Sequence, residues 1–124
     1  MDAQSRKTVL VVDDEDYLRA IWQEVLKLIE TDTISAESGE HAISILKENK
    51  IDMVITDLRM QGSNAFVLLD YLKNDTPEKI PTLICSGFYN ECSDELSSFD
   101  ITRVIPKPFN VREELSLLRD LLYG

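Results

Sequence analysis

The sequence contains few of the residues from which metal and thiol sites are usually built. It has two cysteines, Cys85 and Cys92, and one histidine, His41, in 124 residues. The cysteines are seven positions apart, which matches neither a paired metal-ligand motif nor a redox C-x-x-C motif. Cys85 lies within an apolar run, so we expect a small buried side chain. His41 is distant from every motif described below, and we expect it at the surface.

Long apolar runs and basic charge are also scarce. No run approaches the roughly 18 apolar residues that a membrane-spanning helix needs, and the N-terminus has no apolar segment of signal-peptide length. We therefore expect a cytoplasmic protein that does not enter a membrane. Thirteen basic against twenty-three acidic side chains give a net charge of −10, which repels nucleic acid and anionic membranes. We expect no nucleic-acid binding by this chain alone.

The overall composition is typical of one globular domain. The hydrophobic share is 44% and the charged share 29%, and the length fits one core but not two. No linker, repeat or low-complexity segment interrupts the chain. We expect a single domain over residues 1–124, with no output domain in this chain.

Four apolar runs each end in polar residues that a fully buried strand would not accommodate. Asp13 and Asp14 follow the run at 9–12, Asp57 follows the run at 53–56, Ser86 follows the run at 82–85, and Lys107 follows the run at 104–106. If the runs are neighbouring parallel strands, these endings meet at one edge of the sheet. Open α/β sheets bind their ligands at that edge.

Amphipathic segments with three- and four-residue spacing of apolar positions separate the runs, as is typical of helices. Strands are predicted at 8–12, 33–36, 51–56, 82–85 and 102–105. Helices are predicted at 18–29, after Ser38, at 65–73, at 93–99 and from Asn110 to 122, with 58–64 as a loop. Strands alternating with helices of this length pair in parallel, so the fold class is α/β with helices on both faces of the sheet.

Local signals place some residues within these helices. Ser38 is predicted to cap the second helix, and Asn110 with Glu113 forms an N-x-x-E variant of the capping box. In the first helix, Trp22 is expected in the core and Arg19 on the polar face.

Asp13, Asp14 and Asp57 would bring three carboxylates together at the sheet edge. At about 5 Å and an effective dielectric near 20, each pair repels by roughly 3 kcal/mol, so the cluster requires a counter-ion. An all-oxygen set with few protein ligands suits Mg²⁺, whereas zinc lacks its usual histidine or cysteine ligands. The sequence therefore predicts a magnesium site.

Asp57 stands alone after the central strand and is the candidate nucleophile. Aspartate carboxylates are ionised at neutral pH, and they can attack phosphorus without a general base. Mg²⁺, the Lys107 ammonium and the Ser86 hydroxyl would neutralise the charge on a transferred phosphoryl group. The predicted product is an aspartyl phosphate.

Over essentially its whole length the chain resembles a receiver domain of the bacterial response-regulator family of two-component signal transduction, the CheY-like superfamily. The matching segments are VLVVDDE with Asp13 and Asp14, VITDLRM with Asp57, LICSG with Ser86, and KPF with Lys107. Four motifs in order are a specific signal, whereas one alone is weak. The resemblance implies a flavodoxin-like (βα)5 three-layer sandwich with strand order 2-1-3-4-5.

The resemblance also implies how the metal and the phosphoryl group are bound. Asp14 and Asp57 would bind Mg²⁺ directly, with the backbone carbonyl of Arg59, and Asp13 would act largely through water. Asp57 would take its phosphoryl group from a phosphohistidine on a sensor histidine kinase or a histidine phosphotransfer protein. The Lys107–Pro108 peptide is expected to be cis, which costs roughly 0.5 to 1 kcal/mol before proline.

Phosphorylation would then switch the protein, according to the same resemblance. Ser86 would turn toward the phosphoryl oxygens and Lys107 would pair with them. The change would reach the surface formed by the fourth helix, fifth strand and fifth helix, where an unidentified downstream protein binds. The chain is thus expected to be a switch or phosphate relay that takes part in its own phosphorylation and dephosphorylation, not an enzyme.

Some positions differ from the family pattern. Gln61 and Ala65 stand where relatives have a proline and a glycine after the phosphoacceptor strand, and Val104 replaces an aromatic residue that moves with the serine. Arg59 and Phe88 occupy the positions that tune the phosphoryl lifetime in relatives. These departures keep open an alternative function, a phosphorylation-independent receiver-fold module for protein interaction.

Two enzyme functions fit the sequence less well. A flavin carrier needs a phosphate-binding loop rich in Ser, Thr and Gly after the first strand, where this chain has acidic residues 13–16. A phosphohydrolase of this kind has an acid two residues after its nucleophile, where this chain has Arg59. Helical spacing leaves open whether the apolar face of 111–122 packs inward or forms a homodimer.

Overall fold

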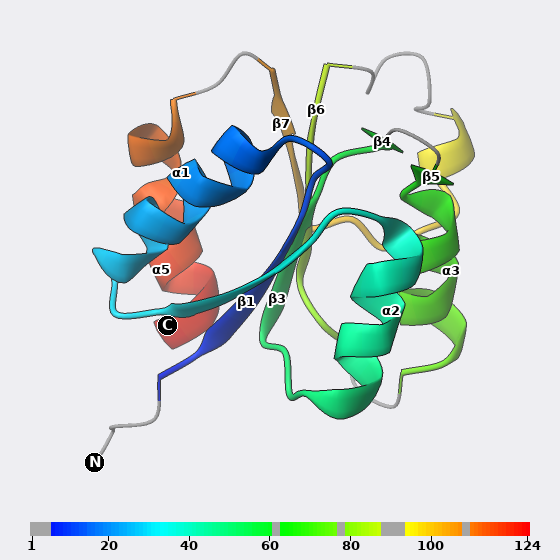
Figure 1. The fold of residues 1–124 in the computed structure, drawn as a ribbon, viewed down its shortest axis with the longest axis horizontal. Coiled ribbons are helices and arrows are strands. Elements are labelled where there is room, and N and C mark those ends of the chain that lie inside the picture. Colours follow the sequence, from blue (N-terminus) through cyan, green and yellow to red (C-terminus); the bar gives the residue numbers. More distant parts are fainter. Residues whose placement is uncertain (1–5, 61–62, 77–78, 88–93, 108–109) are drawn as a thin grey trace.

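The computed structural model has one five-stranded parallel sheet between two layers of helices (Figure 1). The structure describes residues 6–60, 63–76, 79–87, 94–107 and 110–124. The strands are β1 (Thr8–Val12), β2 (Asp32–Ala36), β3 (Met53–Thr56), β6 (Thr82–Ser86) and β7 (Arg103–Pro106). Their order across the sheet is β2-β1-β3-β6-β7, which is the predicted order 2-1-3-4-5. The predicted α/β fold class is confirmed.

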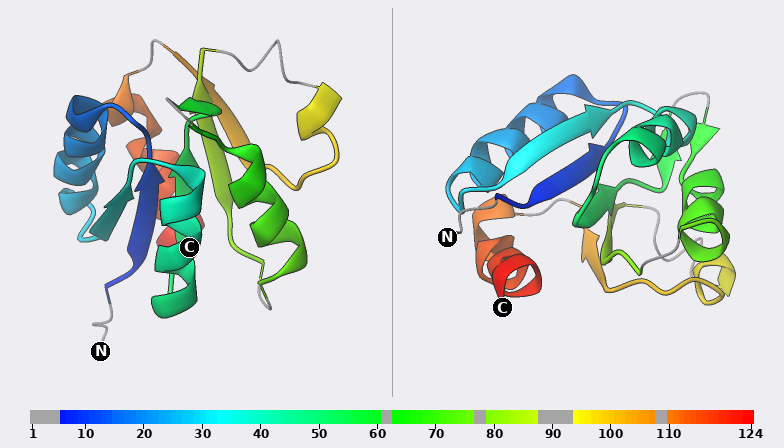
Figure 2. Two further views of the ribbon diagram at one scale, coloured as in Figure 1. Left: turned by 45° about the vertical axis from the view of Figure 1, so that its right-hand side comes forward. Right: turned by 90° about the horizontal axis from the view of Figure 1, so that it is seen from below.

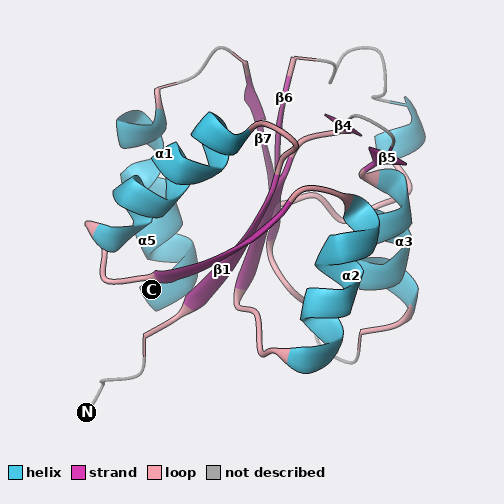
Figure 3. Cartoon of the chain, viewed as in Figure 1, coloured by secondary structure: helices cyan, strands magenta, loops and turns pink. Residues whose placement is uncertain are grey.

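The helices alternate with these strands along the chain (Figure 3). They are α1 (Asp16–Lys27), α2 (Gly39–Glu48), α3 (Phe66–Asn74) and α5 (Leu115–Tyr123), with the 3₁₀ turn η1 (Val111–Glu114) leading into α5. Residues 94–96 are also helical, within the predicted helix at 93–99. None of the helices in the described part of the chain is long and apolar enough to cross a membrane.

Both faces of the sheet are covered, which explains why its central strands are apolar at successive positions. The core under α1 and α5 contains the alternate strand residues Val9, Val11, Met53, Ile55, Leu83 and Cys85. The core under α2 and α3 contains the intervening residues Leu10, Val12, Val54 and Ile84. Figure 2 shows the two helical layers on opposite sides of the sheet. Trp22 is 1% exposed in the first of these cores, which confirms its predicted position.

Helix ends follow the predicted polar signals in part. The Ser38 side chain accepts a hydrogen bond of 3.0 Å from the backbone N–H of His41, so the predicted cap of α2 is confirmed. The Asn110 side chain accepts from the N–H of Arg112 and opens the 3₁₀ turn η1, so α5 itself begins only at Leu115.

The segment after β3 differs from the predicted loop. Its described residues form a short antiparallel hairpin of β4 (Arg59–Met60) and β5 (Ser63–Asn64), in which Arg59 lies opposite Asn64. Met60 is buried, and the N–H of Ala65 donates to the carbonyl of Leu58 at 3.0 Å. This backbone hydrogen bond joins the two ends of the hairpin.

Candidate functional site

The carboxyl ends of four strands bring the predicted site residues to one edge of the sheet. Asp13 follows β1, Asp57 follows β3, Ser86 ends β6 and Lys107 follows β7. The backbone N–H of Asp57 donates to the carbonyl of Val12 at 3.0 Å, and that of Lys107 donates to the carbonyl of Ser86 at 3.3 Å. Main-chain hydrogen bonds between neighbouring strands therefore continue into the site and fix its backbone.

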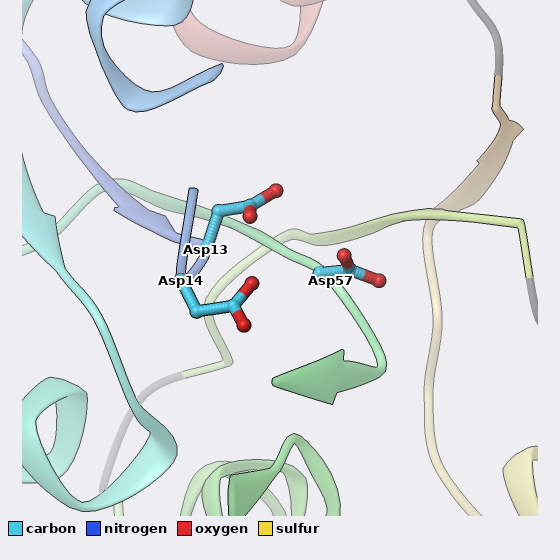
Figure 4. Close-up of side chains that lie close together, drawn as sticks. All are labelled: Asp13, Asp14 and Asp57. Carbon is cyan, nitrogen blue, oxygen red and sulfur yellow. The ribbon is translucent and has the colours of Figure 1, made fainter. Parts of the chain in front are cut away.

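Three carboxylates form the centre of the site (Figure 4). Asp13, Asp14 and Asp57 each offer one carboxylate oxygen, and these oxygens all lie within 4.8 Å of one another. Asp13 is 4% exposed and Asp57 is 6% exposed, while Asp14 is half-buried. The sequence prediction that these three residues meet is confirmed.

Lys107 is the cation that faces this cluster. Its Nζ lies 2.7 Å from Asp57 Oδ2, 3.3 Å from Asp13 Oδ2 and 4.0 Å from Glu15 Oε1. The first two contacts are hydrogen bonds that the ammonium donates. One cation thus offsets part of the repulsion among the carboxylates, and the net charge of the cluster stays negative.

The second oxygen of each buried carboxylate is also held in place. Asp57 Oδ1 accepts a 2.7 Å hydrogen bond from the N–H of Leu58, and Asp13 Oδ1 accepts a 3.0 Å hydrogen bond from the N–H of Glu15. The Thr56 hydroxyl donates to the backbone carbonyl of Asp57 at 2.8 Å. Backbone donors therefore orient both carboxylates toward the same space.

Burial and the charge of the neighbouring residue have opposite effects on the pKa of Asp13 and on that of Lys107. Burial raises the pKa of Asp13 above 3.8, and the hydrogen bond from Glu15 and the charge of Lys107 oppose this without cancelling it. Burial alone would lower the pKa of the Lys107 ammonium, but the hydrogen bond and charge of Asp57, with the charge of Asp13, raise it above 10.5. Lys107 is consequently charged throughout the neutral range.

The donor set fits Mg²⁺. Three carboxylate oxygens within 4.8 Å, two of them from the buried residues Asp13 and Asp57, form a compact all-oxygen site with no histidine or cysteine among its members. Mg²⁺ prefers such ligands and commonly keeps several waters, so three carboxylate oxygens from the protein are enough to bind it. Asp13, Asp14 and Asp57 are the residues that would hold the ion, and the Arg59 carbonyl stays a predicted fourth ligand.

The remaining predicted residues are distributed as follows. Ser86 is 1% exposed at the end of β6, and Val104 is half-buried on β7 against the core under α2 and α3. Arg59 is exposed at the start of β4. Phe88, Gln61 and the Lys107–Pro108 peptide lie outside the described residues. His41 is exposed on α2, as predicted, and its Nδ1 lies 3.5 Å from Glu37.

Sequence reasoning missed one residue of the site. Arg19 was predicted on the polar face of the first helix, but its Nη1 donates a 2.5 Å hydrogen bond to the backbone carbonyl of Asp13. Its spacing places it on the polar face of α1, and no local pattern in the sequence indicates the contact with Asp13.

Known proteins resemble this chain in sequence and in fold. The family model of the response regulator receiver domain matches residues 9–119. The heme response regulator HssR of Staphylococcus haemolyticus is 30% identical over 115 residues, which are 91% of this chain and 50% of that protein. The autoinducer 1 sensor kinase/phosphatase LuxN of Vibrio campbellii is 32% identical over 80 residues, 64% of this chain and 9% of that protein.

A solved structure supports the same relationship. The response regulator TrrA of Thermotoga maritima, determined in complex with Mg²⁺ and BeF, has a TM-score of 0.80 at 27% identity, covering 94% of this chain and 99% of that one. The chain spans about half the length of two of the curated relatives that it matches, since it covers 48% of one and 50% of the other.

Proposed function

Because the chain belongs to the response regulator receiver domain family, we propose that Asp57 is a phosphoryl acceptor in two-component signal transduction. The observation that carries the proposal is the environment of its carboxylate. Asp57 is 6% exposed, accepts a 2.7 Å hydrogen bond from Lys107, and shares an oxygen cluster with Asp13 and Asp14. A nucleophile, a cation and a metal-binding acid pair are thereby within reach of one phosphoryl group.

The proposed reaction transfers a phosphoryl group from a phosphohistidine of a sensor histidine kinase or a histidine phosphotransfer protein. A bond forms between phosphorus and a carboxylate oxygen of Asp57, the bond between phosphorus and the imidazole nitrogen breaks, and the released imidazole takes up a proton from solvent. Asp57 needs no general base, because aspartate carboxylates are ionised at neutral pH. The product is an aspartyl phosphate.

Each neighbour of Asp57 has a separate part in this transfer. Mg²⁺, when bound, supplies positive charge to the phosphoryl oxygens. Asp13 and Asp14, together with Asp57, would hold that ion, the ammonium of Lys107 would pair with a phosphoryl oxygen, and the hydroxyl of Ser86 would donate a hydrogen bond to another. The N–H of Leu58 keeps one carboxylate oxygen of Asp57 oriented, as its 2.7 Å hydrogen bond indicates.

Phosphorylation would alter the charge at the strand ends and so switch the domain. One carboxylate is replaced by a group of about −1.5 to −2 charge with three acceptor oxygens, which competes for Lys107 and Ser86. Ser86 and Val104 lie on the adjacent strands β6 and β7, with Ser86 paired to Pro106. We propose that movement of Ser86 is passed through Val104 without an aromatic partner, and that Arg59 and Phe88 tune the phosphoryl lifetime.

The proposed role is that of a switch or phosphate relay rather than an enzyme. Its partners would be the phosphodonor and a downstream protein. The apolar face of α5 packs inward, since Leu118 and Leu122 are buried in the core under α1 and α5, so a homodimer would have to use another surface. The name of LuxN, a sensor kinase/phosphatase, agrees with a sensor kinase as one such partner. A cytoplasmic location stays a prediction.

A second candidate is a phosphorylation-independent module for protein interaction. It is favoured by Ala65 and Val104, which stand in place of the glycine and the aromatic residue that are typical of the family. In this case the partner would bind the unphosphorylated surface, and Asp57→Asn would leave that binding unchanged.

The deciding experiment is intact mass spectrometry after incubation with a small-molecule phosphodonor. We expect one phosphoryl adduct that requires Mg²⁺, is lost with chelator and is absent in Asp57→Asn. Asp120→Asn, which removes an exposed carboxylate on α5, is the matched control and should form the adduct. If the wild type formed no adduct while a control receiver did, the phosphorylation-independent module would be the better function.

A further inference from the structure

Arg19 connects the first helix to the beginning of the acidic cluster. Its Nη1 donates a 2.5 Å hydrogen bond to the backbone carbonyl of Asp13, and its Nη2 pairs with the carboxylate of Asp16. The Arg19 side chain is 17% exposed, whereas that of Asp16 is 93% exposed. Arginine side chains on a helix surface are usually solvated, so this one is held in a defined orientation toward the main chain.

The carbonyl that Arg19 contacts belongs to the peptide between Asp13 and Asp14. Because a peptide group is planar, fixing its oxygen also fixes the direction in which Asp14 leaves the strand. The N–H of Asp13 donates to the carbonyl of Ala36 at 3.1 Å, and Asp13 Oδ1 accepts from the N–H of Glu15. The hydrogen bond from Arg19 gives the backbone carbonyl of Asp13 a partner as well, so that both backbone groups of Asp13 are paired.

We propose that Arg19 is a positioning residue that holds the Asp13–Asp14 peptide in the orientation required for cation binding at Asp13, Asp14 and Asp57. This inference rests on the proposed function, because it concerns the Mg²⁺ site on which phosphorylation of Asp57 depends. The guanidinium suits the role, since its planar fork donates in two fixed directions, to the carbonyl and to Asp16. A lysine ammonium has no such fork.

The positive charge of Arg19 disfavours Mg²⁺ binding, whereas its hydrogen bond to the Asp13 carbonyl would favour it. A cation near a metal site repels Mg²⁺, so removal of Arg19 would tighten Mg²⁺ binding if charge were its only influence. Removal of a positioning contact has the opposite effect, because the two aspartates are no longer held in the orientation that binds the ion. The sign of the change in affinity therefore separates the two roles.

The test is an NMR titration of the backbone amides with Mg²⁺ alone, using the whole chain and following the dissociation constant. We expect Arg19→Met to raise that constant about tenfold, the magnitude typical for loss of an outer-shell contact. Arg19→Lys should raise it less, because one donor and the charge are retained. Arg119→Met, which removes an exposed arginine of α5, is the matched control and should leave it unchanged or slightly lowered.

A constant for Arg19→Met equal to or below that of the wild type would overturn the positioning role while leaving the proposed function intact. If the wild type bound no Mg²⁺, the proposed function would fall, and the role of Arg19 with it. Circular dichroism in the titration buffer checks that each variant is folded. If Arg19→Met does not fold, Arg19→Lys replaces it in the test. A dissociation constant of Arg19→Lys for Mg²⁺ equal to that of the wild type would then overturn the positioning role of Arg19.

Discussion

Lys107 Nζ lies 2.7 Å from Asp57 Oδ2, and the same ammonium lies 3.3 Å from Asp13 Oδ2. The side chain of Lys107 is 21% exposed, and those of the two aspartates are 7% and 6% exposed. One partly buried cation therefore serves two buried anions that come from different strands. Without Mg²⁺ this arrangement holds the end of β7 to the ends of β1 and β3.

Replacement of Lys107 by methionine should destabilise the metal-free protein by about 2 kcal/mol, because two buried carboxylates lose the cation that they share. Urea unfolding in chelator measures the change. Saturating Mg²⁺ should reduce the loss, since the ion supplies the missing positive charge to the folded state. Lys47→Met, which removes an exposed lysine of α2, is the control and should change stability by less than about 0.5 kcal/mol. Equal effects of the two substitutions would contradict the prediction.

Asp13→Asn should stabilise the metal-free protein at neutral pH by about 1 kcal/mol. The pKa of Asp13 is raised in the folded state by burial, so folding favours its protonated form. Its stabilising contribution is thus complete below pH 3.8 and is lost as the pH rises through the raised pKa. Asparagine stays uncharged, and its advantage over the wild type should disappear in acid.

Urea unfolding at about pH 7 and about pH 3 measures both parts of this prediction. Asp120→Asn removes the same charge from an exposed position on α5 and serves as the control. A loss of stability in Asp13→Asn at neutral pH would show that the ion pair with Lys107 outweighs the cost of burying the carboxylate.

Most of the fold and the centre of the site could be predicted from the sequence because their signals are local. A strand covered on both faces is apolar at successive positions, so a carboxylate directly after it, such as Asp13 or Asp57, is conspicuous. Parallel pairing then brings these strand ends together without further information. The meeting of Asp13, Asp14 and Asp57 follows from this reasoning, whereas the strand order was predicted from the resemblance to receiver domains.

Other features depend on contacts that no local pattern contains. The strands β4 and β5 have two residues each, too few to show the alternation that identifies a strand. Arg19 belongs to the polar face of α1 by its spacing, and only the path of its long side chain brings it to Asp13. These are the places where tertiary structure, rather than periodicity, decides the conformation.

The burial of Cys85 should make the stability of the protein depend on alkaline pH. Burial raises the pKa of its thiol from 9.0 to about 12, so the unfolded chain loses this proton before the folded chain does. The contribution of Cys85 to stability is therefore complete below pH 9.0 and is lost between pH 9.0 and about pH 12. The slope is up to about 1.4 kcal/mol per pH unit.

Comparison of Cys85 with Cys85→Ala, both in a Cys92→Ser background, isolates this effect. Between about pH 8 and about pH 10.5 the chain with Cys85 should lose about 2 kcal/mol more than the alanine variant. All other titrating groups are common to the two proteins and cancel in the difference. Parallel curves of unfolding free energy against pH would indicate that the thiol ionises equally well in the folded protein.

Tyr123 ties the end of α5 to two distant parts of the chain, and its hydroxyl should contribute measurably to stability. The hydroxyl donates to the carbonyl of Glu30 at 2.9 Å, accepts from the N–H of Lys7 at 3.1 Å, and lies 3.2 Å from the hydroxyl of Thr31. Glu30 has a positive φ of 55°, so this contact also stabilises the left-handed turn that follows α1. The ring of Tyr123 keeps its packing in a phenylalanine variant, which removes the hydroxyl alone.

Tyr123→Phe should lower the free energy of unfolding by about 1 to 2 kcal/mol, because a carbonyl and an N–H each lose a partner. The matched control is Tyr17→Phe on α1, where the side chain is 61% exposed and the substitution should have little effect. Hydrogen exchange adds a local test: the amide of Lys7, which donates to Tyr123, should exchange faster in Tyr123→Phe than in Tyr17→Phe. Equal exchange at Lys7 in both variants would mean that solvent replaces the hydroxyl without loss, and the hydrogen bonds of Tyr123 would then contribute nothing to holding α5 in place.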